Sequence, residues 1–231
     1  PFIKLKMHSL DTINLTPYQL KYWRLIYDPV PEGALAPNLF FTGKDTLEIG
    51  EKLTFGVAFK NISQVAFDSL KIKTYILDRN NVPHYIDRSK VKPLIVGDTV
   101  KLMYEIDTEQ YPEMNTLFVD VNPDNDQPEQ HHFNNFMFRN FYVKPDRKNP
   151  LLDVTFDGAH ILNRDIVSPR PHIQNKLKDE AKFLLLNDTA LSLVQIKYPD
   201  GNIRTFNFDG DTLRFTPATS GEDNTATIDL N

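Results

Sequence analysis

The strongest constraint on the fold is a set of short segments in which apolar and polar residues alternate with a period of two. Residues 53–59 carry Leu, Phe and Val at every second position, and residues 70–77 alternate Leu, Ile and Thr with Lys and Tyr. The same pattern returns in residues 100–106, 116–121 and 136–143. Alternation with one polar side is typical of antiparallel sheets that face water on one side. Helical periodicity is nearly absent, so the sequence predicts an all-β protein.

Turn-forming residues separate these segments at the spacing of a β-sandwich. Residues 61–63, 78–81, 96–98 and 122–127 are rich in Asn, Asp, Ser and Gly, which adopt the backbone conformations that tight turns need. Many short strands separated in this way favour an immunoglobulin-like sandwich.

The last third of the chain repeats this organisation. Strand-like composition occurs in six segments: residues 152–156, 172–178, 191–198, 203–208, 213–215 and 225–230. Asp200-Gly201 between the third and fourth predicts a hairpin, because Gly supplies the left-handed backbone of a tight turn. About seven strands are usual for such a sandwich. The count of six leaves open that its final strands lie outside this chain.

The chain therefore divides into two tandem immunoglobulin-like antiparallel β-sandwiches. A charged segment with two prolines, residues 144–150, has the composition of a stiff linker. We expect an N-terminal segment at residues 1–34, a first sandwich at 35–145 and a second at 148–231. Because the chain begins at Pro1 without a signal peptide, we also expect further protein before it.

The N-terminal segment is rich in aromatic residues. Thr16 with Pro17 and Gln19 resembles a helix start, and residues 21–27 have the composition of a strand. We expect the segment to pack on the first sandwich through Trp23, the single Trp of the chain. The alternative is that Trp23 and Tyr27 stack against a ligand.

Composition excludes several functions. The net charge of −5 and a pI near 5.7 argue against nucleic acid, because no basic stripe is available for phosphates. No apolar run approaches the roughly 20 residues that span a bilayer. The chain has no Cys, so thiol nucleophiles, thiolate metal sites and disulfides are absent. Motifs for nucleophilic hydrolysis and phosphate binding are also missing, and we predict that this chain is not an enzyme.

One acidic stretch is a candidate calcium site. Ca²⁺ takes six to eight oxygen ligands, and short acidic loops supply them. The alternative is an acidic hairpin whose side chains bond their own backbone. No other cofactor is expected. Five oxygen-bearing side chains fall within ten residues: Asp120, Asn122, Asp124, Asp126 and Glu129.

A sugar-binding surface is a second candidate, because a flat aromatic ring offers apolar area to a sugar face. The candidate rings are Trp23, Tyr27, Phe40 and Phe41. The chain has 16 Phe and 9 Tyr, and most of these must form the cores.

Residues 50–61 (GEKLTFGVAFKN) resemble the start of a CARDB-type domain, a bacterial immunoglobulin-like adhesion module. Such domains carry an acidic, Asn-rich turn that closes with Glu and then Asn-Asn, as residues 120–129 and Asn134-Asn135 do here. The resemblance covers about residues 42–143. It implies the immunoglobulin-like fold of the first sandwich.

Residues 148–230 resemble the region after the catalytic domain of gingipain-like, C25-family cysteine peptidases of Bacteroidetes, which include the sortase-like members of the type IX secretion system. The matching stretches are residues 152–163 (LDVTFDGAHILN), 165–168 (DIVS), 171–173 (PHI), 177–180 (LKDE) and 186–189 (LNDT). In that family a Cys–His dyad in an upstream domain performs the chemistry.

Together these resemblances imply a structural or interaction module of a secreted or cell-surface bacterial protein, located either outside the cell or at the cell surface in association with the outer membrane. Its partner would be an upstream peptidase domain or a secretion or cell-surface protein. The open alternatives are an adhesin or glycan-binding module and a calcium-dependent binding domain.

Overall fold

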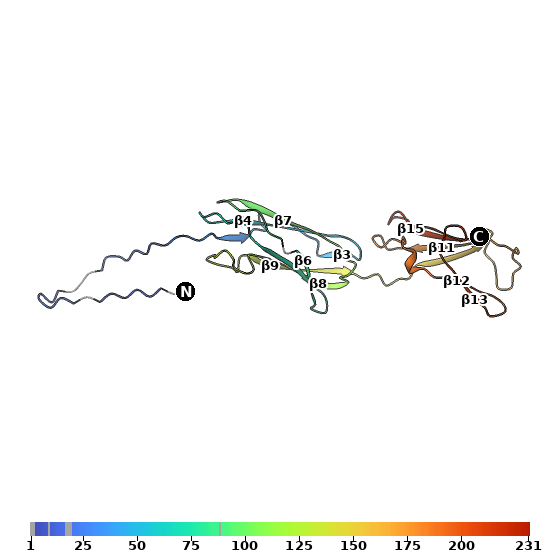
Figure 1. Ribbon diagram of the computed structural model, residues 1–231, viewed down its shortest axis with the longest axis horizontal. Helices are drawn as coiled ribbons and strands as arrows, with labels where there is room; N and C mark the ends of the chain where they lie inside the picture. The colour runs from blue at the N-terminus through green and yellow to red at the C-terminus, as the bar shows by residue number, and fades with distance from the viewer. Residues whose placement is uncertain (1–2, 9, 17–19, 88) are drawn as a thin grey trace.

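The computed structural model describes residues 3–8, 10–16, 20–87 and 89–231. Its strands form two β-sandwiches that follow one another along an elongated molecule (Figure 1). The N-terminal segment extends from one end of this molecule, and the second sandwich forms the other end. The all-β prediction is confirmed: the one helical element among the described residues is a 3₁₀ turn, Thr189–Leu191.

The first sandwich contains two sheets. In the four-stranded sheet, the long strand β4 pairs with β7 on one side and with the short strands β1 and β2 on the other, always antiparallel. Its strands are β1 (Gly33–Leu35), β2 (Phe41–Thr42), β4 (Leu53–Asn61) and β7 (Thr99–Ile106).

The five-stranded sheet has the order β3-β9-β8-β5-β6. Its edge strand β3 runs parallel to β9, which departs from the purely antiparallel expectation, because the chain crosses from one sheet to the other between β2 and β3. An ion pair between Arg139 and Asp45 joins β9 to this crossing. The strands are β3 (Thr46–Glu48), β5 (Ile72–Leu77), β6 (Pro83–Asp87), β8 (Glu113–Val121) and β9 (Phe136–Lys144).

The core between these two sheets follows the predicted alternation. In β8, Leu117, Val119 and Val121 point inward and are buried, whereas the residues between them face water at least in part. The largest buried side chains include Phe55 and Phe59 of the four-stranded sheet and Phe141 of the five-stranded sheet, together with Phe67 of the connection between β4 and β5. Burying such aromatic area is the dominant favourable contribution to folding.

The N-terminal segment differs from the expectation. No strand forms at residues 21–27, and every side chain from residue 20 to 29 is exposed, including Trp23 at 49%. The segment therefore does not pack on the first sandwich through Trp23, because a ring packed on a sheet would be buried. Residues 30 and 31 are half-buried, and Glu32, beside β1, is the first buried side chain. The predicted helical turn falls largely on residues 17–19, outside the described residues.

The second sandwich is smaller. A four-stranded antiparallel sheet of order β10-β11-β15-β14 faces the hairpin β12–β13, whose turn contains the predicted Asp200-Gly201. The strands are β10 (Leu151–Phe156), β11 (Ile173–Asp179), β12 (Val194–Lys197), β13 (Ile203–Phe206), β14 (Leu213–Thr216) and β15 (Asn224–Leu230). Its fully buried apolar cluster consists of Leu213, Ile228 and Leu230.

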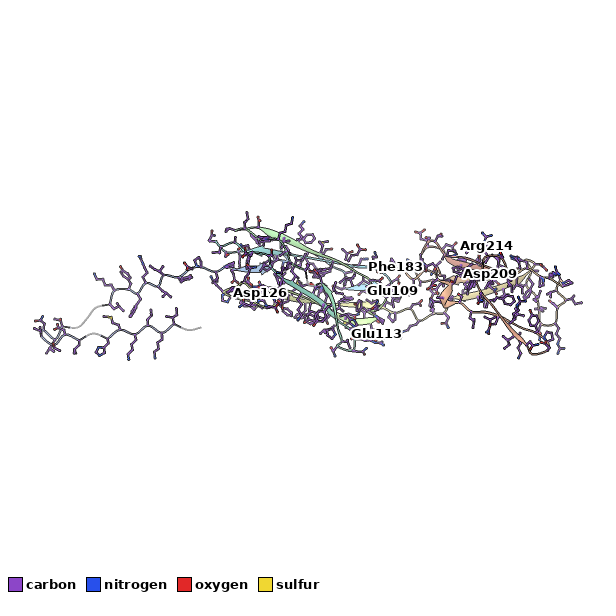
Figure 2. The ribbon with its side chains drawn as sticks, in the orientation of Figure 1. Glu109, Glu113, Asp126, Phe183, Asp209 and Arg214 are labelled. Atoms are coloured by element: carbon purple, nitrogen blue, oxygen red, sulfur yellow. The ribbon has the colours of Figure 1, made fainter. Side chains whose placement is uncertain are left out.

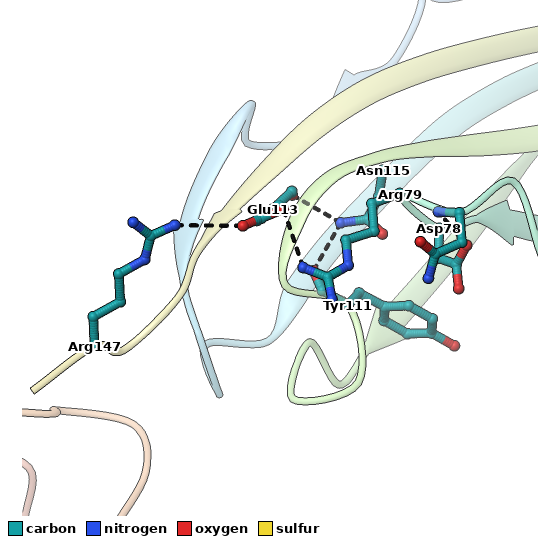
Figure 3. Close-up of polar contacts among 7 residues, drawn as sticks. Asp78, Arg79, Tyr111, Glu113, Asn115 and Arg147 are labelled. Atoms are coloured by element: carbon teal, nitrogen blue, oxygen red, sulfur yellow. Dashed lines mark hydrogen bonds and ion pairs between the residues drawn. The ribbon is translucent and has the colours of Figure 1, made fainter. Parts of the chain in front are cut away.

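The connection between the sandwiches lies between the end of β9 and the start of β10. Arg147 of this connection donates to Glu113 at the start of β8, over 3.4 Å, and the same carboxylate accepts from Arg79 (Figure 3). On the other side Lys148 pairs with Glu180 over 2.6 Å. Phe183 lies at the junction, against the turn at Gly50 (Figure 2). Exposed ion pairs of this kind each contribute about 0–1 kcal/mol.

The alternation on β9 predicts opposite consequences for two substitutions on one strand. Phe141 is 2% exposed in the core and Phe138 is 61% exposed on the outer face. We expect Phe141→Ala to lower the free energy of unfolding of the first sandwich by about 3–5 kcal/mol. Phe138→Ala removes ring contacts alone and should cost at most about 1.5 kcal/mol. Chemical denaturation followed by circular dichroism measures both, and equal losses would contradict the assigned faces.

Candidate interaction surface

The outer face of the five-stranded sheet carries four aromatic side chains in one line, which we call the aromatic row. Tyr85 of β6 pairs in register with Tyr75 of β5, Tyr75 with Phe118 of β8, and Phe118 with Phe138 of β9. Side chains directly opposite each other on one face of a sheet lie in contact. The strand register thus brings together four rings that are up to 63 positions apart in sequence.

The rings of the aromatic row stand against one another. Tyr75 and Phe118 are stacked, with centroids 4.8 Å apart and planes 4° from parallel. Tyr85 and Phe138 flank them at centroid distances of 5.8 and 6.1 Å. Each such pair contributes about 0.5–1.5 kcal/mol beyond its buried area. The faces of the central rings are covered by their neighbours, so the row presents ring edges to water.

Charged and apolar groups border the aromatic row. Lys73 lies 5.5 Å from the centroid of Tyr75 and 5.7 Å from that of Tyr85, within reach of a cation–π attraction. Phe136 widens the row beside Phe118, at 5.7 Å. Beside Phe136 in the register, Asp120 bonds His132 over 3.1 Å, and burial raises the pKa of the Asp120 carboxyl.

The aromatic row contains none of the four rings that the sequence predicted for a sugar-binding surface. Of the four predicted rings, Phe40 is half-buried under Lys101. Phe41 makes an edge-to-face contact with Phe55, and both belong to the four-stranded sheet rather than to the sheet that carries the aromatic row. Trp23 and Tyr27 are exposed on the N-terminal segment. The structure therefore does not gather the four predicted rings. The sequence does show aromatic residues at the water-facing positions of strands with apolar–polar alternation. It does not show the strand register that aligns these residues in one row.

A second feature is a buried polar network at the end of the first sandwich where the N-terminal segment joins. Glu32, which the sequence analysis did not single out, is 7% exposed. Its carboxylate accepts from the backbone N–H groups of Gln130 and His131 over 2.8 and 3.0 Å, and from the Asn134 side chain over 2.8 Å. The backbone of Leu35 also donates to Asn134. These bonds attach β1 to the loop that precedes β9.

Glu129 forms the other half of this network. One carboxylate oxygen accepts from the Gly33 N–H over 3.1 Å, and the other accepts from the side chains of Asn122 and Asn135 over 2.7 and 2.5 Å. Asn122 has a left-handed backbone, with φ of 59°, which Asn tolerates better than most residues. Burial raises the pKa of the Glu129 carboxyl, against these hydrogen bonds. The Glu and Asn-Asn residues that resembled a CARDB signature therefore have a structural role here.

The acidic stretch does not assemble into a cation site. Asp124 and Asp126 both pair with Lys71, over 3.2 and 2.5 Å, Asp120 bonds His132, and Asn122 and Glu129 belong to the network. The five predicted oxygens are thus divided among three sets of partners. Across the described part of the chain, no group of three or more His, Asp or Glu is placed to hold a metal ion.

No helix among the described residues is long and apolar enough to cross a bilayer.

The polar groups at the junction of the sandwiches line a cavity of about 400 Å³, in which Glu180 and Lys148 pair with each other.

No protein-family model matches the sequence, and no curated protein matches it. Among solved structures, a CARDB domain from Pyrococcus furiosus, determined with di-metal ions, is similar at 18% identity and a TM-score of 0.43 over 52% of this chain and 100% of the other. A domain of a Methanosarcina acetivorans chain described as a cell-surface protein is similar at 15% identity and 0.37, over 49% and 92%. A Listeria innocua β-glucosidase is similar at 20% and 0.38, over 49% of this chain and 16% of the enzyme. Likenesses of this size assign no ligand or activity to this chain.

The geometry of Glu129 predicts a cost for Glu129→Gln. The amide nitrogen of Gln must face either the Gly33 N–H or two Asn amide groups, so a donor meets a donor. We expect a loss of about 1–3 kcal/mol in the free energy of unfolding, whereas Glu109→Gln on an exposed loop (Figure 2) should change it by about 0.5 kcal/mol or less.

The stability difference between the wild type and Glu129→Gln should also depend on pH. Because its pKa is raised on folding, Glu129 binds its proton more tightly in the folded state, and its contribution to stability falls as pH rises from the unfolded pKa, about 4.3, to the folded pKa. The wild-type advantage over Glu129→Gln should therefore shrink across that window. An advantage that grows with pH there would show that the pKa is lowered instead.

The division of the acidic oxygens predicts that calcium does not stabilise the chain. A ligand bound only to the folded state must raise the melting temperature by mass action. We expect the same melting temperature in calcium and in chelator. A higher temperature in calcium, abolished by Asp124→Asn with Asp126→Asn, would show that the loop rearranges into a site.

Proposed function

We propose that this chain is a non-catalytic interaction module of a secreted or cell-surface protein, and that the aromatic row is the surface through which it contacts a protein partner. The observation that carries this proposal is the aromatic row itself. Water-facing sheet positions are usually polar, whereas here four aromatic residues occupy one line across four strands, with Tyr85 49% and Phe138 61% exposed.

The geometry of the row favours a protein over a sugar. A sugar ring stacks on an open aromatic face, but the central faces of Tyr75 and Phe118 cover each other. A ridge of ring edges instead fits between apolar side chains of a protein, and aromatic anchors dominate the energy of protein interfaces. Lys73 at the border supplies a cation for a hydrogen-bonded rim.

The partner that best fits is the domain that precedes this chain in its parent protein. The network around Glu32 and Glu129 fixes the point at which the N-terminal segment leaves the first sandwich. Residues 1–31 would then tether a preceding domain within roughly 100 Å of that point, which is enough to reach the outer face of the five-stranded sheet. The resemblance of residues 148–230 to gingipain-like peptidases supports a cysteine peptidase of the type IX secretion system in Bacteroidetes as that domain. The two sandwiches would then position it at the outer surface of the cell.

The proposed surface predicts a selective loss of binding. In calorimetric titrations of this chain into the separately produced preceding domain, Phe138→Ser should raise the Kd at least tenfold, which corresponds to about 1.4 kcal/mol. The matched control is Met103→Ser, because Met103 is also exposed and lies on β7 of the opposite sheet. Equal effects of both variants, or none from Phe138→Ser, would contradict the assignment of the surface.

The identity of the parent is tested separately, by its sequence before Pro1. A domain with a Cys and a His placed for catalysis is expected there. A series of further sandwiches without such a pair would remove the peptidase from the proposal and leave the interaction surface to be tested on those sandwiches.

A further inference from the structure

We propose that the N-terminal segment of one copy of this chain adds a β-strand to the second sandwich of another copy, so that copies associate end to end. Two observations support this inference. One is an extended segment with an apolar face that pairs with no strand in the described structure, and the other is a second sandwich whose core is open and whose strands do not cover it.

The extended part is residues 3–8. Ile3, Leu5 and Met7 alternate strictly with Lys4, Lys6 and His8, and all six side chains are exposed. This pattern gives an extended segment one apolar face and one basic face, which is the pattern of a strand with one face in a core. Residues 20–27 are also exposed but carry apolar side chains on both faces, so they fit a half-buried strand less well.

The receiving part is the gap between the two sheets of the second sandwich. A cavity of about 490 Å³ opens there, lined mainly by aliphatic side chains, among them Leu152, Leu177, Leu186, Leu191, Leu193 and Ile228. Among the described residues the fully buried apolar cluster of this sandwich has three members, against eighteen in the first. The core of the second sandwich is therefore much smaller than that of the first.

A free strand edge borders this gap. In the described structure β12 pairs with β13 alone, and β12 also lines the cavity through Val194 and Gln195. Hydrogen-bonded and non-hydrogen-bonded residue pairs alternate along an antiparallel hairpin. The hydrogen bond from the Tyr198 N–H to the Asn202 carbonyl shows which pairs of β12 and β13 are the hydrogen-bonded ones. The N–H groups of Gln195 and Lys197 therefore point away from β13. A strand added at this edge would take main-chain bonds from β12 and place alternate side chains in the cavity.

The two parts belong to different copies because they lie at opposite ends of the molecule, with the first sandwich between them (Figure 1). Charge favours the same arrangement. Residues 1–31 contain four Lys or Arg and two Asp, whereas residues 148–231 contain nine Lys or Arg and twelve Asp or Glu. A contact between two different surfaces leaves one of each unused at the ends, so it extends into open chains. This inference uses neither the aromatic row nor the preceding domain, and it stands or falls independently of them.

Sedimentation velocity of the whole chain over a wide concentration range tests the proposal. The wild type should form progressively larger species as concentration rises. Leu5→Lys places a charge on the apolar face of the strand, and Leu193→Arg places one in the cavity; each should weaken association at least tenfold. Both side chains are exposed, Leu193 at 72%, so neither change should unfold the protein. Ile13→Lys is the control and should associate like the wild type, because Ile13 is also exposed, at 87%, but lies outside residues 3–8.

Mixing the two defective variants is the sharpest test. The Leu193→Arg copy keeps the wild-type N-terminal strand, and the Leu5→Lys copy keeps the wild-type cavity. An equimolar mixture should therefore form a dimer through this one contact and nothing larger. A wild type that remains a monomer at every concentration would overturn the proposal. So would association that is indifferent to both substitutions, or a mixture that behaves like either variant alone.

Discussion

The architecture of the first sandwich depends on two carboxylates at one of its ends, those of the buried Glu32 and the half-buried Glu129. Burying a charged group is costly unless hydrogen bonds replace its water. Glu32 and Glu129 obtain those bonds from backbone N–H groups and from Asn side chains. The same bonds join β1 to the loop between β8 and β9, residues about 100 positions away. Removing one carboxylate would leave several buried donors without acceptors, so the whole end of the sandwich shares one constraint.

That constraint connects the fold to the proposed function. It fixes the point at which the N-terminal segment leaves the first sandwich, and it holds the loop that leads into β9. Strand β9 in turn carries Phe141 into the core and Phe138 onto the aromatic row. The core therefore positions the exposed rings, since a shift of β9 by one residue would exchange its two faces. A rigid, preformed row of this kind costs little ordering free energy when a partner binds.

Much of the fold was predictable from periodicity, and the failures have physical causes. Strands β4, β5, β7, β8 and β9 are long enough for the alternation to appear, and Asp200-Gly201 specifies the hairpin β12–β13. Strands β1, β2 and β3 have two or three residues each, too few to show a period. Residues 21–27 have strand-forming composition but pair with no strand among the described residues, and a lone strand has no inter-strand hydrogen bonds to stabilise it. The aromatic row and the Glu32 bonds depend on contacts distant in sequence, which one sequence does not reveal.

We infer that the aromatic row is covered by a partner when the chain is part of its parent protein. Hydroxyl-radical footprinting measures this directly, by comparing the labelling of Tyr85 and Phe138 in this chain with their labelling in the whole protein, with Met103 as the reference on the opposite sheet. We expect strong labelling of both rings in the isolated chain and a several-fold decrease in the parent, while the labelling of Met103 stays unchanged. Equal labelling of the two rings in both proteins would contradict it.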